Sequence, residues 1–136
     1  MPLGELEEEG LHKILIIGAE KLFIDRVKEM LPESDDYKYE LASSGFEAGI
    51  QAESFHPDTI IVDLAMGRSE ALQIAQNLRR NAQYEATLIV GLASEDEANP
   101  EALTQYGYSE AFKKPFDVAL LAERIRTIVE EKRENM

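Results

Sequence analysis

Three ionisable side chains lie at or just after the ends of predicted strands. The carboxyl ends of the strands form the edge of the sheet where an α/β domain usually holds its functional groups. Glu20 and Asp63 follow apolar runs, and Lys114 follows a shorter run. An ammonium group that reaches a carboxylate can steady it, or can steady an anion attached to it. Structural explanations are equally simple: an aspartate can cap the next helix, a glutamate can complement a helix dipole, and a lysine before a turn can be exposed.

The composition is that of a globular domain with a strong negative charge. The chain has 136 residues, of which 44% are hydrophobic and 30% charged, and its formal net charge is −13. This charge repels phosphate backbones and anionic lipids, so we expect the domain itself to bind neither nucleic acid nor a membrane. The absence of cysteine and the presence of only two histidines exclude disulfides, thiolate metal sites and histidine-rich metal sites.

A chain of this length is expected to form one domain around a single hydrophobic core. We expect an acidic tail or linker at residues 1–11, a folded domain at 12–132 and a short tail at 133–136. No apolar run approaches the length of a membrane span, and the acidic start is unlike a signal peptide. A cytoplasmic protein is therefore predicted.

Five predicted strands alternate with five predicted helices. Near-continuous apolar runs predict strands that are covered on both faces, and Ser43 or Ser44 can cap the second helix. The predicted strands are residues 12–17, 37–41, 58–64, 87–92 and 110–113. The predicted helices are residues 20–31, the capped segment that ends near residue 55, 68–80, 96–106 and 117–132.

This alternation with short connections predicts an α/β fold, a parallel sheet with helices on both faces. We expect a doubly wound, flavodoxin-like α/β/α sandwich with the strand order 2-1-3-4-5. In that order the first and third strands are neighbours. Gly18 and Asp63 are then expected to converge at one edge of the sheet.

Two segments resemble the receiver domain of bacterial response regulators, the phosphoacceptor module of two-component (phosphorelay) signal transduction. The segment P-D-T-I-I-V-D-L-A-M, at residues 57–66, resembles the third strand of that family. The segment G-Y-S-E-A-F-K-K-P-F, at residues 107–116, resembles the stretch that ends in the family's Lys-Pro pair. The resemblance extends over about residues 12–132.

The resemblance assigns a role to three residues. It implies that Asp63 is the phosphoacceptor and that Lys114 is the cation that contacts the acceptor or its phosphoryl group. It also implies a cis peptide bond at Pro115, which proline tolerates because its trans preference is only about 0.5–1 kcal/mol.

The metal site of the family is only partly present. The family holds Mg²⁺ with two adjacent acids after the first strand, where this sequence has Gly18 and Ala19. Glu20 is one residue late, which leaves Asp63 and, weakly, Glu20 as metal candidates.

The residues that normally report phosphorylation also differ. Leu92 stands where the family has a serine or threonine, and Ser94 lies two positions later. Ala111 stands where the family has an aromatic switch residue. Tyr108 comes too early to replace it, and Phe112 should face the opposite side because strand side chains alternate.

These departures predict a degenerate, atypical receiver that acts mainly through protein–protein interaction. Mg²⁺ offsets the negative charge that phosphoryl transfer brings together, and losing it costs roughly 10³-fold in rate. We expect no required cofactor, with Mg²⁺ involved only if Asp63 is phosphorylated, and no enzymatic activity of its own.

The expected partners are signalling proteins, either a histidine kinase or an output domain. The family's usual output surface lies around the fourth helix, the fifth strand and the fifth helix. Leu103, Tyr106, Tyr108 and Phe112 are candidate apolar anchors there, although the same residues could equally be core side chains or singly exposed ones.

Two other hypotheses remain. Asp63 could be a working phosphoacceptor if Glu20 contributes to a magnesium site and Ser94 bends inward. More remotely, I-I-G-A-E could be a truncated nucleotide-binding turn, although only Gly18 of the G-x-G-x-x-G fingerprint is present.

Overall fold

The apolar runs of the sequence form a parallel sheet of five strands in the order β2-β1-β3-β4-β5. The computed structural model describes residues 12–18, 21, 24–25, 29, 37–93, 100–113 and 118–134. Every strand pair is parallel, and the order confirms the prediction. The strands are β1 His12–Ile17, β2 Tyr37–Ala42, β3 Thr59–Asp63, β4 Leu88–Ala93 and β5 Glu110–Lys113.

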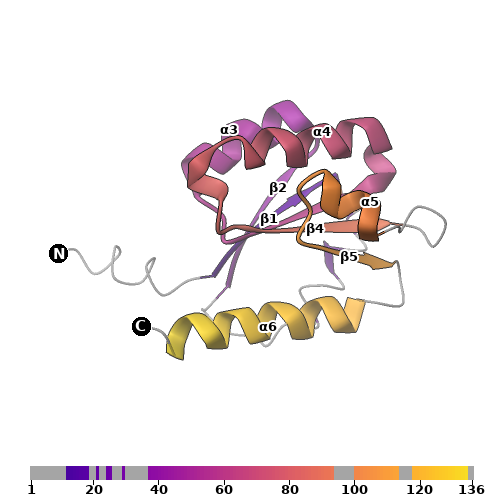
Figure 1. Cartoon of the computed structure of the whole chain (residues 1–136). Helices are drawn as coiled ribbons and strands as arrows, with labels where there is room; N and C mark the ends of the chain where they lie inside the picture. Colours follow the sequence, from indigo (N-terminus) through magenta and orange to yellow (C-terminus); the bar gives the residue numbers. More distant parts are fainter. Residues whose placement is uncertain are drawn as a thin grey trace.

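Helices cover both faces of the sheet and confirm the predicted α/β/α layers (Figure 1). One layer holds α3 Gly45–Phe55, α4 Arg68–Arg79 and α5 Pro100–Gln105, and the other holds α6 Val118–Glu134. Two short 3-10 helices, η1 Leu64–Met66 and η2 Ala82–Tyr84, lie in the connections. None of the helices in the described ranges is both long and apolar enough to cross a bilayer.

The strands are apolar throughout because both of their faces are buried. Leu15 and Ile17 of β1 belong to the core under α3 and α4, whereas Ile14 and Ile16 belong to the core against α6. All four side chains are at most 1% exposed. This alternation fixes which face each strand residue presents.

The limits of α3 follow from its caps. The Ser44 side chain accepts a hydrogen bond from the backbone N–H of Glu47 at 3.2 Å, which confirms the predicted serine cap. At the other end, His56 adopts a left-handed conformation with φ of 54° and donates its N–H to the carbonyl of Ala52. Pro57 follows and cannot continue the helix.

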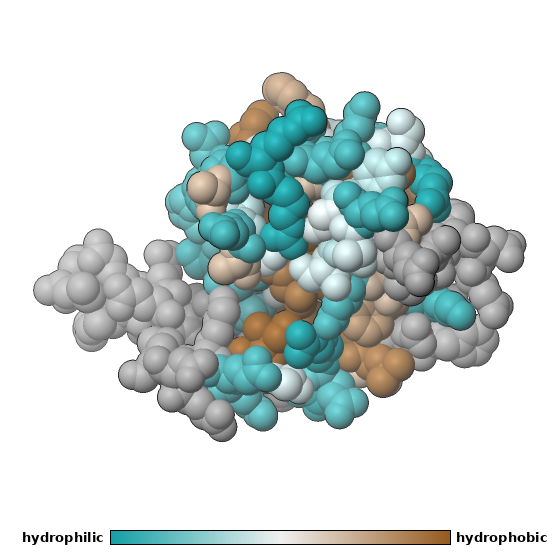
Figure 2. All heavy atoms as spheres, viewed as in Figure 1, coloured by the Kyte–Doolittle hydropathy of each residue, from teal (hydrophilic) through white to brown (hydrophobic). Residues whose placement is uncertain are grey.

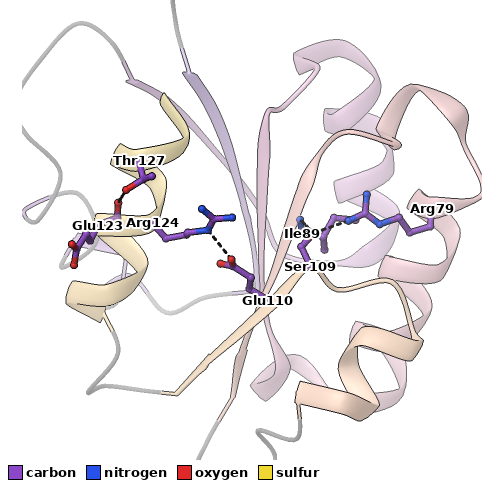
Figure 3. Close-up of polar contacts among 7 residues, drawn as sticks. All are labelled: Arg79, Ile89, Ser109, Glu110, Glu123, Arg124 and Thr127. Atoms are coloured by element: carbon purple, nitrogen blue, oxygen red, sulfur yellow. Dashed lines mark hydrogen bonds and ion pairs between the residues drawn. The ribbon is translucent and has the colours of Figure 1, made fainter. Parts of the chain in front are cut away.

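Arg79 joins the end of α4 to the segments that lead into β4 and β5 (Figure 3). Its guanidinium donates to the carbonyl oxygens of Tyr84, Thr87 and Gly107 at 2.8–2.9 Å. It also donates to the Ser109 hydroxyl at 2.9 Å. Gly107 has φ of +105°, and a Cβ there would lie 2.7 Å from the Arg79 Cγ, so this position requires glycine.

Candidate functional site

Asp63 is the last residue of β3, at the carboxyl edge of the sheet, and its side chain is 1% exposed. β3 lies between β1 and β4. Since Ile17 pairs with Val62, Gly18 and Asp63 are the next residues along their two strands. The predicted convergence of Gly18 and Asp63 is therefore confirmed.

The Asp63 carboxylate also has a structural role. Its Oδ1 accepts a hydrogen bond from the backbone N–H of Ala65 at 2.9 Å and so caps η1. An aspartate favours this position because its carboxylate satisfies a helix N–H that would otherwise have no partner. The capping explanation and a functional role for Asp63 are compatible, because a carboxylate offers several acceptor positions.

Leu92 lies next to Asp63 across the β3–β4 pairing. Paired residues of parallel strands present their side chains to the same face of the sheet. Leu92 is 1% exposed and belongs to the core against α6. The neighbour of the Asp63 carboxylate on β4 is therefore a buried aliphatic group and not a hydroxyl.

Ala111 and Phe112 of β5 face opposite sides of the sheet. Ala111 pairs with Gly91 and contacts the core under α4, whereas Phe112 pairs with Leu92 and contacts the core against α6. The alternation expected from the sequence is observed. The Phe112 ring therefore lies on the opposite face of the sheet from Ala111, and cannot take the place of an aromatic residue at position 111.

Tyr108 occupies the space over Gly91, where a Cβ would lie 3.3 Å from its ring. The hydroxyl of Tyr108 donates to the carbonyl of Ala71 in α4 at 2.7 Å. Burial raises the pKa of Tyr108, because the phenolate would be cut off from water. The ring is thus held between β4 and α4.

Leu103 and Tyr108 are core side chains, and this contradicts their assignment as candidate anchors of the output surface. Leu103 is 1% exposed and Tyr108 is 2% exposed, and both belong to the core under α4. Tyr106 and Phe112 are half-buried. The core explanation therefore holds for two of the four candidates: Leu103 is buried on α5, and Tyr108, which follows α5, packs over Gly91.

Several predicted site residues lie outside the described ranges. These are Glu20, Lys114 and Pro115, together with Ala19 and Ser94. Within the described ranges, no three acidic, histidine or cysteine side chains gather where they could hold a metal ion. The described part of the site therefore supplies the Asp63 carboxylate but no metal cluster around it.

A hollow of about 610 Å³ lies at α5, β5 and α6. Its lining includes Ala111, Phe112 and Leu120, and an ion pair at 2.7 Å joins Glu110 of β5 to Arg124 of α6 (Figure 3). Leu120 is 55% exposed and was missed by the sequence analysis. The signal was available, because Leu120 lies off the buried stripe that includes Leu121 and Ile125.

Comparisons with known proteins identify the family. The model of the response regulator receiver domain matches residues 14–126. Response regulator ArlR of Staphylococcus aureus is 29% identical over 117 residues, which are 86% of this chain and 52% of that protein. The chain thus matches about half the length of this curated relative.

Solved structures of response regulators have a similar fold. The chemotaxis response regulator CheY4 of Vibrio cholerae superposes with a TM-score of 0.71 at 25% identity, over 87% of this chain and 98% of that one. The signal receiver domain of a DNA-binding response regulator (merR) from Colwellia psychrerythraea 34H gives a TM-score of 0.73 at 23% identity, over 88% and 98%. The chain therefore belongs to the receiver domains of response regulators, which act in two-component signal transduction.

Proposed function

We propose that this receiver domain is degenerate and acts mainly through protein–protein contacts. Receiver domains of response regulators interact with histidine kinases and with output domains. In this chain, Asp63 keeps the position of the acceptor and Lys114 that of the cation, but the sequence lacks the usual acidic pair for Mg²⁺ and has Leu92 and Ala111 at the switch positions. The domain then needs no cofactor, has no catalytic activity of its own and works in the cytoplasm.

The observation that carries this proposal is the pairing of Asp63 with Leu92. A phosphoryl group on a carboxylate carries several negatively charged oxygens, which need hydrogen-bond donors and cations around them. The Leu92 side chain is buried in an apolar cluster and has no group that can donate a hydrogen bond. Bringing a dianionic group next to that cluster is costly, because charge is strongly disfavoured in apolar surroundings.

The residues in and just before β5 support the same proposal. Ala111 has no ring that could move in response to a change at Asp63. Tyr108, a buried tyrosine earlier in the same segment, is anchored through its hydroxyl to the backbone of α4. A ring that is already buried and hydrogen-bonded has little reason to change position on phosphorylation.

The contact surface that we propose is formed by α5, β5 and α6. It carries the hollow lined by Phe112 and Leu120, with the Glu110–Arg124 ion pair beside it. Apolar side chains next to fixed charges are the usual arrangement of a protein-binding patch. A histidine kinase or an output domain is the partner class proposed for this surface.

Phosphorylation by a small-molecule donor tests the proposal. The chain is incubated with Mg²⁺ and acetyl phosphate beside a receiver domain that has both acidic metal ligands, and intact mass is followed over time. We expect labelling about 10³-fold slower than in the reference domain, with Asp63→Asn as the control for site specificity. Fast, stoichiometric acyl phosphate on Asp63 would refute the proposal.

The placement of Asp63 supports one alternative, a working phosphoacceptor. Its carboxylate lies at the carboxyl edge of the sheet, between β1 and β4. In this alternative Glu20 helps to bind Mg²⁺ and Ser94 bends inward. A magnesium titration separates the two proposals, because a low-millimolar dissociation constant that is lost in Asp63→Asn would favour the working acceptor.

A further inference from the structure

α3 and α4 touch at one end and diverge towards the other. A Cβ at Gly45 would lie 3.2 Å from Ile74, whereas a Cβ at Gly49, one turn further along α3, would meet nothing within 4 Å. The divergence leaves a groove of about 530 Å³. Leu15 and Ile17 of β1 line its floor, so the groove reaches down to the sheet.

Large apolar side chains stand exposed beside this groove. Phe46 lines the groove and is 82% exposed, the highest value among the large hydrophobic residues of the described ranges. Ile50 is 57% exposed and lies one turn along the same side of α3. Figure 2 shows apolar side chains at the crest of this helical layer, over α3. Neighbouring apolar side chains that are exposed to solvent on one helix are typical of an interaction site.

The polar lining of the groove is acidic or neutral. Among the lining residues are carboxylates and carboxamides, and no lysine or arginine is found among them within the described ranges. The polar lining residues from α3, α4 and the η2 region are Glu53, Glu70, Gln73, Asn77, Asn81 and Gln83. Together with a net charge of −13 for the chain, this lining favours a cationic occupant.

We propose that the α3–α4 groove binds a basic amphipathic helix of a partner protein. The apolar side of that helix would contact Phe46 and Ile50, and its lysine or arginine side chains would face Glu53. A second copy of this chain is disfavoured as the occupant, because a symmetric pairing would bring the Glu53 and Glu70 carboxylates of the two copies together. The groove is separate from the α5–β5–α6 surface, with which it shares no lining residue.

The test uses a synthetic peptide of about 18 residues, a length sufficient for a stable bound helix, with a leucine stripe on one side and lysines on the other. Binding to the full ¹⁵N-labelled chain is followed by NMR. We expect saturable shifts in the amides of α3 and α4. A peptide of the same composition without the stripe, and one with glutamate in place of lysine, should bind much more weakly.

Variants identify the surface that binds. Phe46→Ser should weaken binding by about tenfold or more, and Glu53→Lys should weaken it through charge alone. Ile50→Ser has a matched control in Leu120→Ser on the other contact surface, since the two side chains are 57% and 55% exposed. Ile50→Ser should weaken binding, whereas Leu120→Ser should not. Because all four side chains are outside the core, far-UV circular dichroism should be unchanged.

Three results would overturn the proposal. The first is the absence of binding up to millimolar peptide. The second is a set of shifts centred on α5, β5 and α6 that Leu120→Ser abolishes and Phe46→Ser leaves intact. The third is a dimer of the chain in sedimentation that Phe46→Ser dissolves, which would mean that a second copy occupies the groove.

Discussion

Asp63 and Leu92 are neighbours at the carboxyl edge of the sheet, and both are 1% exposed. The carboxylate caps η1 through Ala65 while its neighbour on β4 offers only a methyl-lined surface. Phosphorylation at this position depends on which groups can donate hydrogen bonds to the added phosphoryl oxygens. At the residue scale, our proposal rests on an Asp63 carboxylate that has the position of an acceptor but has a side chain beside it on β4 that cannot donate a hydrogen bond to an added anion.

Tyr108→Phe tests the fixed position of the buried ring. Removing the hydroxyl leaves the carbonyl of Ala71 without this donor, so we expect a loss of about 1–2 kcal/mol in the free energy of unfolding. The variant is measured by urea denaturation at pH 8. Tyr106→Phe, on the same segment but half-buried, is the matched control and should change stability by less than about 0.5 kcal/mol. Equal losses in the two variants would contradict a specific role for Tyr108.

The same tyrosine predicts an alkaline effect. Burial raises the pKa of Tyr108 in the folded state above the unfolded value of about 10. Its stabilising contribution is therefore complete below pH 10 and is lost as the pH rises towards the folded pKa. The stability difference between the wild type and Tyr108→Phe should narrow above about pH 10. A difference that stays constant up to pH 11 would contradict this assignment.

At the scale of elements, the strands were predictable and the connections less so. Each observed strand lies within one residue of its predicted bounds, because an apolar run that is buried on both faces has few alternative structures. The Ser44 cap was an equally local signal. Leu103 was misassigned because the side of α5 that meets the sheet is decided by packing and not by the sequence of that short helix.

The role of Arg79 could not be predicted, because its acceptors lie up to 30 residues away along the chain. Arg79→Lys keeps the charge but loses the planar group that reaches several acceptors at once. We expect a loss of about 2–4 kcal/mol in the free energy of unfolding, measured by urea denaturation. Arg80→Lys is the matched control because Arg80 is exposed, and it should change little. A small effect of Arg79→Lys would mean that an ammonium group satisfies these carbonyls.

At the scale of the whole molecule, the net charge of −13 sets the conditions for stability and for partner choice. Like charges on a compact domain repel each other, and dissolved salt screens that repulsion. We expect the midpoint of thermal unfolding to rise by a few degrees between about 20 mM and about 500 mM NaCl, with KCl giving the same result. A fall with salt would mean that attractive pairs such as Glu110–Arg124 dominate instead.

The proposal that the phosphoryl site is degenerate is tested most directly with a phosphoryl analogue that binds without a covalent transfer step. Beryllofluoride is added to the full chain with millimolar Mg²⁺, and bound fluoride is followed by ¹⁹F NMR, with Asp63→Asn as the control. We expect no bound resonance, because within the described ranges no cluster of acidic side chains surrounds Asp63 and its neighbour on β4 is Leu92. A stoichiometric bound resonance that disappears in Asp63→Asn would show that this domain retains a working acceptor site.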